Sequence, residues 1–273
     1  MTTTTPGPGT STGGAGPLLR TWRQRRRISQ LDLAIRADSS ARHISFIETG
    51  RARPSEEMLL RLADHLEVPV RERNALLLAA GYAPRYTQTP LADPAMGALR
   101  EGLERLLSGY EPYPALVVDA TYDVVAANRG IAMMLEGLPE HLLAPPVNAV
   151  RITLHPEGLA PRILNFLEWR GHLLAQMERQ IALARSESLR ALYDEVAAYP
   201  LPDRHPEDPG PDAEPVPYFA LPLRIELGGQ VLSFVSSIST FNTPMDVTVA
   251  ELAIETMLPA DPATVKYLRS LGP

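Results

Sequence analysis

No cysteine occurs among the 273 residues of this sequence. Disulfide bridges, zinc sites built on thiolates and cysteine nucleophiles are therefore excluded. Long apolar runs are missing as well, since runs such as residues 75–80 and 114–118 fall far short of the ~20 residues of a membrane helix. Residues 1–16 carry no charged side chain and no apolar core of a signal peptide. These absences exclude a transmembrane protein and predict a cytoplasmic one that has no membrane partner.

The motifs of common enzyme classes are also missing. The sequence contains no GxSxG nucleophile elbow between a strand and a helix, no HExxH zinc motif and no phosphate-binding P-loop. His155, Glu157 and His172 are not spaced as metal ligands on one helix. We therefore expect no enzymatic activity, no cofactor and no metal site.

Charge is present but unevenly distributed. The net charge is −6, yet residues 17–86 hold 13 Arg and 8 acidic residues, a balance of +5. The rest of the chain holds 13 basic and 24 acidic residues. A basic first third joined to an acidic remainder is typical of a nucleic-acid-binding domain followed by a domain that avoids nucleic acid. The alternative is that the basic domain is merely soluble.

The first third of the chain has the spacing of a small all-α domain. Residues 1–16 are mostly Thr, Pro and Gly and predict a disordered tail. Five short helices are expected within residues 17–82. Leu19 and Trp22 belong to the buried side of the first helix. Its exposed side and its end are crowded with arginines, namely Arg20, Arg23, Arg25, Arg26 and Arg27.

The later helices of this domain carry start and stop signals. Ser29 is expected to cap the second helix, with Asp32 completing a near capping box. Ser39 or Ser40 is expected to cap the third helix, and Ser55 the fourth. Gly50 is expected to end the third helix in the left-handed conformation, and the fifth helix is expected to end at Gly81. Residues 83–94 contain three prolines and predict a linker.

The remaining residues, 95–273, predict a mixed α+β domain with an antiparallel sheet. Helices are expected near residues 95–109, 129–136, 159–185 and 187–199. Strands are expected at residues 114–119 and 124–127, and a hairpin at residues 218–241 turns on its Gly-Gly pair. A last strand or helix covers residues 247–257. The proline-rich stretch 200–217 between these elements predicts a loop.

The segment at residues 29–55 reads SQLDLAIRADSSARHISFIETGRARPS. It resembles the helix-turn-helix of the XRE (Cro/CI-type) repressor family, and the match extends over residues 17–80. Ala34 is small where the third helix crosses the second, and Ile44 and Ile47 fill the core. One position departs from the family pattern, because Asp38 occupies a turn position usually given to Gly. Asp tolerates a positive φ better than most residues, so we expect the turn to survive.

The resemblance implies a set of DNA-contacting residues on and around the third helix. Arg42 is expected to read guanine, His43 a base or phosphate, and Ala41 and Phe46 a thymine methyl group. Gln30 and Ser40 are expected at phosphates, and Arg51 and Arg53 at the backbone beyond the helix. The alternative for each is a solvated or, for Phe46, partly buried side chain. The full predicted set is Gln30, Ser40, Ala41, Arg42, His43, Ser45, Phe46, Arg51 and Arg53.

Three later segments resemble the MmyB-like ligand-binding domain found behind XRE domains in actinobacterial regulators. They are PALVVDATYDVVAANRGIAMML at 114–135, NAVRITLHPEGLAPRILNFLEWRGHLLAQ at 148–176 and STFNTPMDVTVAELAIETMLPAD at 239–261. The resemblance covers most of residues 90–270. It implies a PAS-like fold with a pocket for a small apolar or fatty-acid-like ligand.

A few polar and aromatic residues stand among the apolar helices of this second domain. Phe166 and Trp169 are predicted to wall an apolar cavity, while a cationic side chain meets a ligand carboxylate. The predicted ligand set is Asn128, Arg162, Phe166, Trp169, Arg170, His172 and Phe241. Each has a plainer alternative, such as a helix N-cap for Asn128 or a core position for Trp169.

These features together predict a one-component transcription regulator. Its N-terminal domain is expected to bind a double-stranded DNA operator as a homodimer, because two recognition helices about 34 Å apart read a palindrome. Its C-terminal domain is expected to sense a small apolar or amphipathic molecule. The alternative is that the second domain is only a dimerisation or protein-interaction platform. A cavity with converging polar groups favours sensing, and a filled core with an exposed apolar patch favours the platform.

Overall fold

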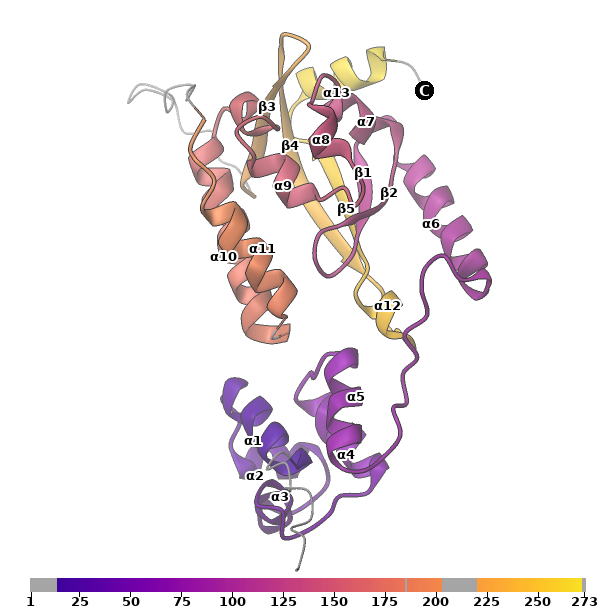
Figure 1. Ribbon diagram of the computed structural model, residues 1–273, viewed down its shortest axis with the longest axis vertical. Helices are drawn as coiled ribbons and strands as arrows, with labels where there is room; N and C mark the ends of the chain where they lie inside the picture. The colour runs from indigo at the N-terminus through magenta and orange to yellow at the C-terminus, as the bar shows by residue number, and fades with distance from the viewer. Residues whose placement is uncertain (1–13, 185, 203–219, 272–273) are drawn as a thin grey trace, which may run out of the picture. The chain divides into compact units, whose positions relative to one another are not determined.

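The computed structural model describes residues 14–184, 186–202 and 220–271. It divides into two compact units, each described by itself below (Figure 1). The first comprises Met1–Gln88 with Pro244–Val247, and the second comprises Thr89–Thr243 with Thr248–Pro273. Among the described residues, no helix is both long and apolar enough to cross a membrane. Residues 1–13 of the predicted tail and residues 203–217 of the predicted proline-rich loop lie outside this description.

The first unit is a five-helix domain, as predicted. Its helices are α1 (Ala15–Arg25), α2 (Gln30–Arg36), α3 (Ala41–Glu48), α4 (Glu56–His65) and α5 (Val70–Ala79). The core contains Leu19, Trp22, Leu33, Ile44 and Ile47, all of which are buried. Periodic apolar residues therefore turn one face of each helix toward a common centre.

Local capping chemistry sets the helix boundaries. The hydroxyls of Ser29, Ser40 and Ser55 accept hydrogen bonds from backbone amides in the first turns of α2, α3 and α4. At Ser29 the reciprocal bond to Asp32 completes a capping box. Of the two serines expected before α3, Ser40 is the cap.

The positive φ predicted at Asp38 and Gly50 is confirmed, and Gly81 has a positive φ as well. Asp38, in the turn between α2 and α3, has a φ of 48°. Gly50 and Gly81 follow α3 and α5 with φ of 73° and 78°. The predicted turn therefore survives the departure from glycine at Asp38.

The start of α1 corrects one expectation. The predicted tail extended to residue 16, but α1 begins at Ala15, and Ala15 and Gly16 are both buried. A Cβ atom on Gly16 would lie 2.3 Å from the carbonyl oxygen of Ile47. The glycine therefore belongs to the domain, because it lets the backbones of α1 and α3 approach closely.

The second unit combines helices with one sheet, and its elements follow in chain order. They are η1 (Pro94–Met96), α6 (Gly97–Gly109), β1 (Ala115–Val118), β2 (Val124–Ala127), α7 (Arg129–Leu135), α8 (Glu140–Leu143), α9 (Ala149–Leu154), η2 (Ala160–Arg162), α10 (Phe166–Ala184), α11 (Glu187–Ala197), β3 (Pro222–Leu227), β4 (Gln230–Thr240), α12 (Val247–Ala250), β5 (Ala253–Pro259) and α13 (Pro262–Ser270). The sequence did not predict α8, α9 or α13. The helix expected at 159–185 begins only at Phe166, because the short turn η2 precedes α10. The stretch predicted as one strand or helix at 247–257 is a short helix followed by a strand.

The sheet has five antiparallel strands in the order β2-β1-β5-β4-β3. The predicted hairpin is confirmed as β3 and β4, joined by Gly228 and Gly229, both with positive φ. The late strand β5 lies between β1 and β4, where Leu116 of β1 stands directly opposite Glu255 of β5. The predicted α+β fold with an antiparallel sheet is confirmed.

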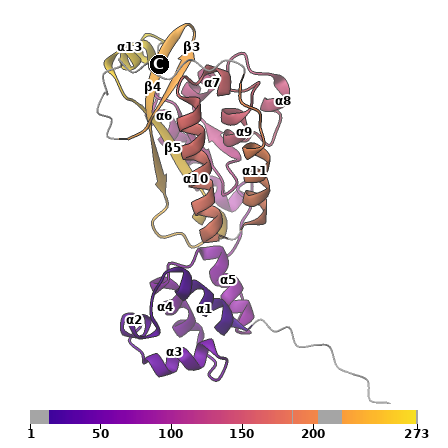
Figure 2. The same cartoon turned by 90° about the vertical axis from the view of Figure 1, so that its left-hand side faces the viewer.

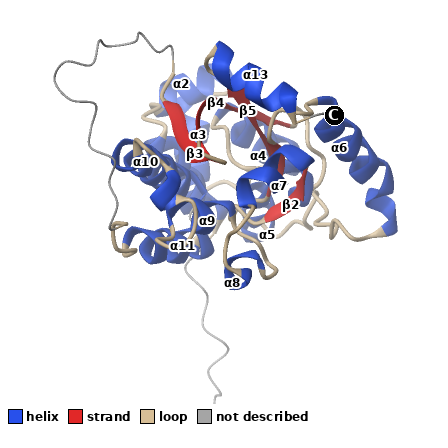
Figure 3. Ribbon diagram, turned by 90° about the horizontal axis from the view of Figure 1, so that it is seen from above, coloured by secondary structure: helices blue, strands red, loops and turns tan. Residues whose placement is uncertain are grey.

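Helices cover both faces of the sheet (Figure 3). On one face, Leu103 and Leu107 of α6 pack with Ala115, Val117 and Ile254. On the other face, apolar side chains of α7, α9, α10 and α11 join sheet residues in the largest core cluster. Figure 2 shows α10 and α11 side by side along this second face. The candidate ligand site lies within this second layer.

Candidate functional site

The first candidate site is the surface of the helix-turn-helix formed by α2 and α3. Ile44 and Ile47 of α3 are buried, whereas Arg42 is exposed. The half-buried residues of the same helix are Ala41, His43, Ser45 and Phe46. The helix therefore anchors two apolar residues in the core and presents the side chains between them, which is the arrangement of a recognition helix.

The side chains of α3 are partly ordered by one another. The Arg42 guanidinium carbon lies 5.3 Å from the centroid of the Phe46 ring. The Nδ1 atom of His43 lies 3.3 Å from the Ser39 hydroxyl. Stacking on a ring reduces the freedom of a long side chain and holds a guanidinium at the helix surface. Ser39 was not among the predicted DNA-contacting residues.

Predicted phosphate-contacting residues already have partners within the protein. The side chain of Ser40 accepts the backbone N–H of His43 as the cap of α3. The Gln30 amide donates to the Glu48 carboxylate at 2.8 Å. Arg53 donates to the Gly81 carbonyl at 3.3 Å and lies over the Tyr82 ring. Arg51 is exposed.

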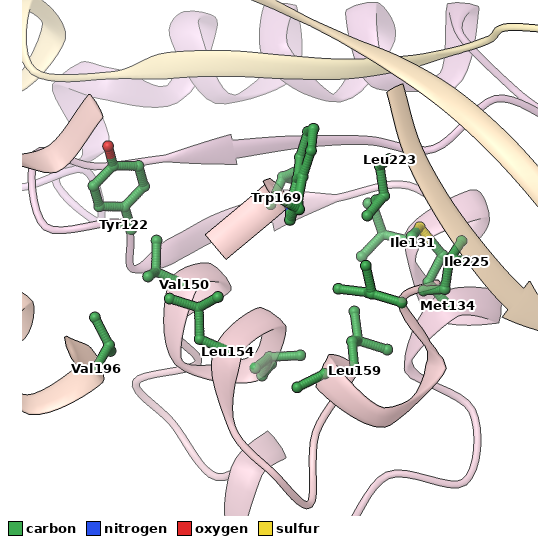
Figure 4. Close-up of a cluster of buried hydrophobic side chains, with 14 of the residues drawn as sticks. Tyr122, Ile131, Met134, Val150, Leu154, Leu159, Trp169, Val196, Leu223 and Ile225 are labelled. Atoms are coloured by element: carbon green, nitrogen blue, oxygen red, sulfur yellow. The ribbon is translucent and has the colours of Figure 1, made fainter. Parts of the chain in front are cut away.

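The second candidate site is a cavity of about 110 Å³ in the second unit. Its wall is mostly apolar, and Figure 4 shows Tyr122, Trp169 and Leu223 in that order across the surrounding cluster. Four polar residues also line it, namely Tyr122, Thr153, Gln176 and Glu255. The cavity is large enough for a small apolar molecule and offers a few groups that can orient it.

Tyr122 and Glu255 are the titratable groups of the cavity wall. The Tyr122 hydroxyl donates to Gln180 Oε1 at 2.8 Å, and burial raises the pKa of this tyrosine to about 12. The Ser236 hydroxyl donates to Glu255 Oε1 at 2.5 Å. Burial also raises the pKa of Glu255, although Ser236 and nearby His172 act in the opposite direction. A raised pKa means that ionisation of this carboxyl is costly where it stands.

The predicted ligand residues are dispersed around this cavity. Trp169 lines it, and Phe166 is buried in the same core cluster. Asn128 is the N-cap of α7, which was the alternative to a ligand contact for this residue. Its amide nitrogen donates to the carbonyls of Leu107 and Tyr113.

The predicted cationic partners of a ligand carboxylate lie outside the wall. Arg162 donates to the carbonyl of Glu136, and Arg170 to that of Ala197. His172 is exposed beside Trp169, with the two ring centroids 5.7 Å apart. These cations are absent from the described lining: Arg162, at the end of η2, and Arg170, on α10, donate to backbone carbonyls, and His172 of α10 is exposed.

Phe241 requires a correction. It was expected to share the cavity space, but it packs against the cluster that contains Leu103 and Val117 on the opposite face of the sheet. Side chains point to alternate faces along a strand. Because β4 ends at Thr240, this alternation does not predict which face of the sheet Phe241 covers.

Tyr122, Gln176 and Glu255 line the cavity but were not among the predicted ligand residues. A signal for Glu255 was present, because a lone acid interrupts the apolar run of β5. In that strand Glu255 and Met257 line the cavity while Ile254 packs on the other face. Because successive side chains of a strand point to opposite faces of the sheet, this alternation could have placed Glu255 on the face that holds the cavity.

His141, His155 and Glu157 form a further cluster at the surface, with ligand atoms within 4.8 Å of one another. His141 Nε2 lies 3.4 Å from the Glu157 carboxylate. The backbone N–H of Glu157 donates to His155 Nδ1 at 3.1 Å, which leaves the proton of a neutral ring on Nε2. His141 comes from α8, whereas His155 and Glu157 belong to the turn after α9, and the hydrogen bond to Nδ1 already occupies one ring nitrogen of His155.

Comparison with known proteins matches the two parts of the chain separately. Residues 99–271 match the family model of the MmyB-like transcription regulator ligand binding domain. Residues 15–76 match a helix-turn-helix domain. No curated protein matches the chain. One solved structure, the clp gene regulator ClgR from Corynebacterium glutamicum, is 25% identical over 37% of this chain and 93% of its own, with a TM-score of 0.23.

Proposed function

The chain belongs to the family of MmyB-like transcription regulators, and we propose that it couples operator binding to occupancy of the cavity in its second unit. The predicted resemblance to a helix-turn-helix regulator with an MmyB-like domain is confirmed. The observation that carries the proposal is the mostly apolar cavity inside the matched ligand-binding domain. A ligand acts through different affinities for the DNA-competent and incompetent states.

For the DNA-binding unit we propose α3 as the recognition helix. Arg42 is the proposed base-reading residue, because it is exposed and held by the Phe46 ring. Arg51 and Arg53 are the proposed phosphate-contacting residues after the helix. The Gln30 amide can donate to a phosphate only if it gives up its hydrogen bond to the Glu48 carboxylate. A homodimer would place two such helices in successive major grooves.

For the second unit we propose binding of a small, mainly apolar molecule. The alternative, a dimerisation or protein-interaction platform, predicts a filled core with an exposed apolar patch. The cavity and its polar groups favour sensing over that alternative. The proposal extends to Trp169 as part of the wall, whereas the positions of Arg162 and Arg170 do not support a contact with a ligand.

Native mass spectrometry of the purified full chain tests the proposal directly. We expect a dimer that carries a small apolar adduct, which denaturing extraction would then release for identification. Selection from a random double-stranded DNA library should yield a palindromic site. Binding to the selected site should change when the adduct is removed, and unchanged binding would contradict the coupling.

A further inference from the structure

The cavity wall is asymmetric in charge. Of its 20 lining residues, 16 are apolar, and none of these described residues is Arg, Lys or His. Tyr122 remains neutral because burial raises its pKa to about 12. Glu255 is therefore the one group of the wall that can carry a charge at neutral pH.

The hydrogen bonding of the Glu255 carboxyl leaves it able to accept from a further donor. Ser236 donates to one carboxyl oxygen of Glu255, Oε1. The Tyr122 hydroxyl is already committed to Gln180. Among the described residues, Ser236 is the side chain whose hydrogen bond to this carboxyl is resolved. The other carboxyl oxygen is thus suited to accept from a ligand.

The aromatic residues of the wall also favour a positively charged ligand group. Tyr122 and Trp169 both line the cavity with Glu255. The faces of aromatic rings carry negative potential and attract ammonium groups, most strongly where water is excluded. A carboxyl group combined with two aromatic side chains therefore suits a cationic ligand head.

A carboxylate head would meet the opposite conditions. It would face a like charge on Glu255 when that group is ionised, without a basic partner in the wall. Arg162 and Arg170 are engaged with the carbonyls of Glu136 and Ala197. His172 is near enough to Glu255 to act on the pKa of that carboxyl, but it is exposed and lies outside the lining.

We infer that the ligand of this cavity is a small apolar amine whose ammonium group pairs with Glu255 and whose hydrocarbon part fills the apolar wall. The inference rests on the proposed sensing function and specifies its ligand class. It replaces the fatty-acid-like ligand with one of opposite charge. Binding would also offset the cost of ionising Glu255 in the cavity.

Isothermal titration of the full chain with octylamine, octanol and octanoate tests this inference. The three probes share a hydrocarbon chain and differ in the charge of the head. We expect octylamine to bind at least about 10-fold more tightly than octanol, and octanoate most weakly. Glu255→Gln should weaken octylamine binding about 10-fold while changing octanol binding less than about 2-fold.

Glu226→Gln, on the exposed side of β3, is the matched control and should leave all three affinities unchanged. A melting curve of Glu255→Gln checks that the variant is folded. Equal binding of the three probes, or tightest binding of octanoate, would overturn the amine assignment while leaving the sensing function intact. Failure of all three to bind would overturn both.

Discussion

Arg23 and Glu48 form a two-point ion pair that joins α1 to the end of the proposed recognition helix. Arg23 Nε and Nη2 donate to the two carboxylate oxygens of Glu48 at 2.6 and 2.9 Å. The Glu48 side chain is only 1% exposed, and it also accepts from the Gln30 amide. The pair therefore fixes the orientation of α3 from inside the domain. The prediction that Arg23 lies on the exposed basic side of α1 is therefore wrong.

Removal of one partner of this pair should destabilise the first unit. We expect Arg23→Ala to lower its free energy of unfolding by about 3 kcal/mol, because Glu48 would be left charged and buried. Urea denaturation followed by Trp22 fluorescence in a Trp169→Phe background reports this unit. The control is Glu67→Gln, since Glu67 is 80% exposed and its pair with an arginine should contribute less than about 1 kcal/mol. Equal effects of the two changes would contradict the prediction.

Gly16→Ala should also destabilise the first unit. A Cβ atom there would lie 2.3 Å from the Ile47 carbonyl oxygen, so α1 would have to move away from α3. We expect a loss of about 1–3 kcal/mol, typical of overpacking in a core. Gly14→Ala is the matched control, because no atom lies within 4 Å of its Cβ position. Thermal melting of the two variants checks this, and a stable Gly16→Ala would refute the close contact.

Arg42→Ala and Arg51→Ala should affect DNA binding in different ways. Loss of a base contact at Arg42 should weaken binding to the selected site by about 1–3 kcal/mol and relax its sequence preference. Loss of a phosphate contact at Arg51 should weaken binding to all sequences and reduce the salt slope by about 1. Fluorescence anisotropy at several salt concentrations measures both. Arg105→Ala, an exposed change in the second unit, serves as the control.

The Glu255 carboxyl should make stability depend on pH. Its folded-state pKa is raised by burial, so its contribution is full below the ordinary glutamate pKa of about 4.3 and is lost as pH rises through the raised value. The native chain should therefore lose stability as the pH rises from acidic to neutral, and Glu255→Gln should not. The melting temperature of the variant, relative to that of the native chain, should rise over this range. Tyr122 stays neutral in this range. His172 is the basic residue that acts on Glu255, whereas Arg179 acts on Tyr122.

Melting curves at about pH 4.5 and pH 8 compare the two chains across this window. The melting temperature of the Glu226→Gln control should differ from that of the native chain by the same amount at both pH values. Ionisation of the exposed Glu226 carries no cost of burial. If the difference in melting temperature between Glu255→Gln and the native chain were also the same at both pH values, the predicted pH dependence would be contradicted.

The fold of the first unit could be predicted from its sequence because its signals are local. Ser29 and Ser55 cap the helices that follow them, and Asp38 adopts the positive φ expected of its turn. Each of these interactions spans a few residues, so spacing along the chain is enough to find it. The position of Arg23 was missed because its partner lies 25 residues away.

The candidate ligand site was predicted as a region but not as a set of residues. Trp169 was identified because a large aromatic residue on an apolar helix is visible in the sequence. Glu255 was missed, and the arginines predicted as ligand partners point to backbone carbonyls. A helix pattern shows which residues are apolar, but it does not show which neighbouring carbonyl captures a long side chain.

The sequence by itself determined the two-part organisation, the helix-turn-helix and the class of regulator, since these depend on short-range periodicity, capping and composition. Only the tertiary structure decided the chemistry of the cavity. It inserts β5 between β1 and β4, so that Glu255 stands opposite Leu116 and near Tyr122. Such pairing joins segments far apart in the chain, and its register depends on how both faces of the sheet are buried.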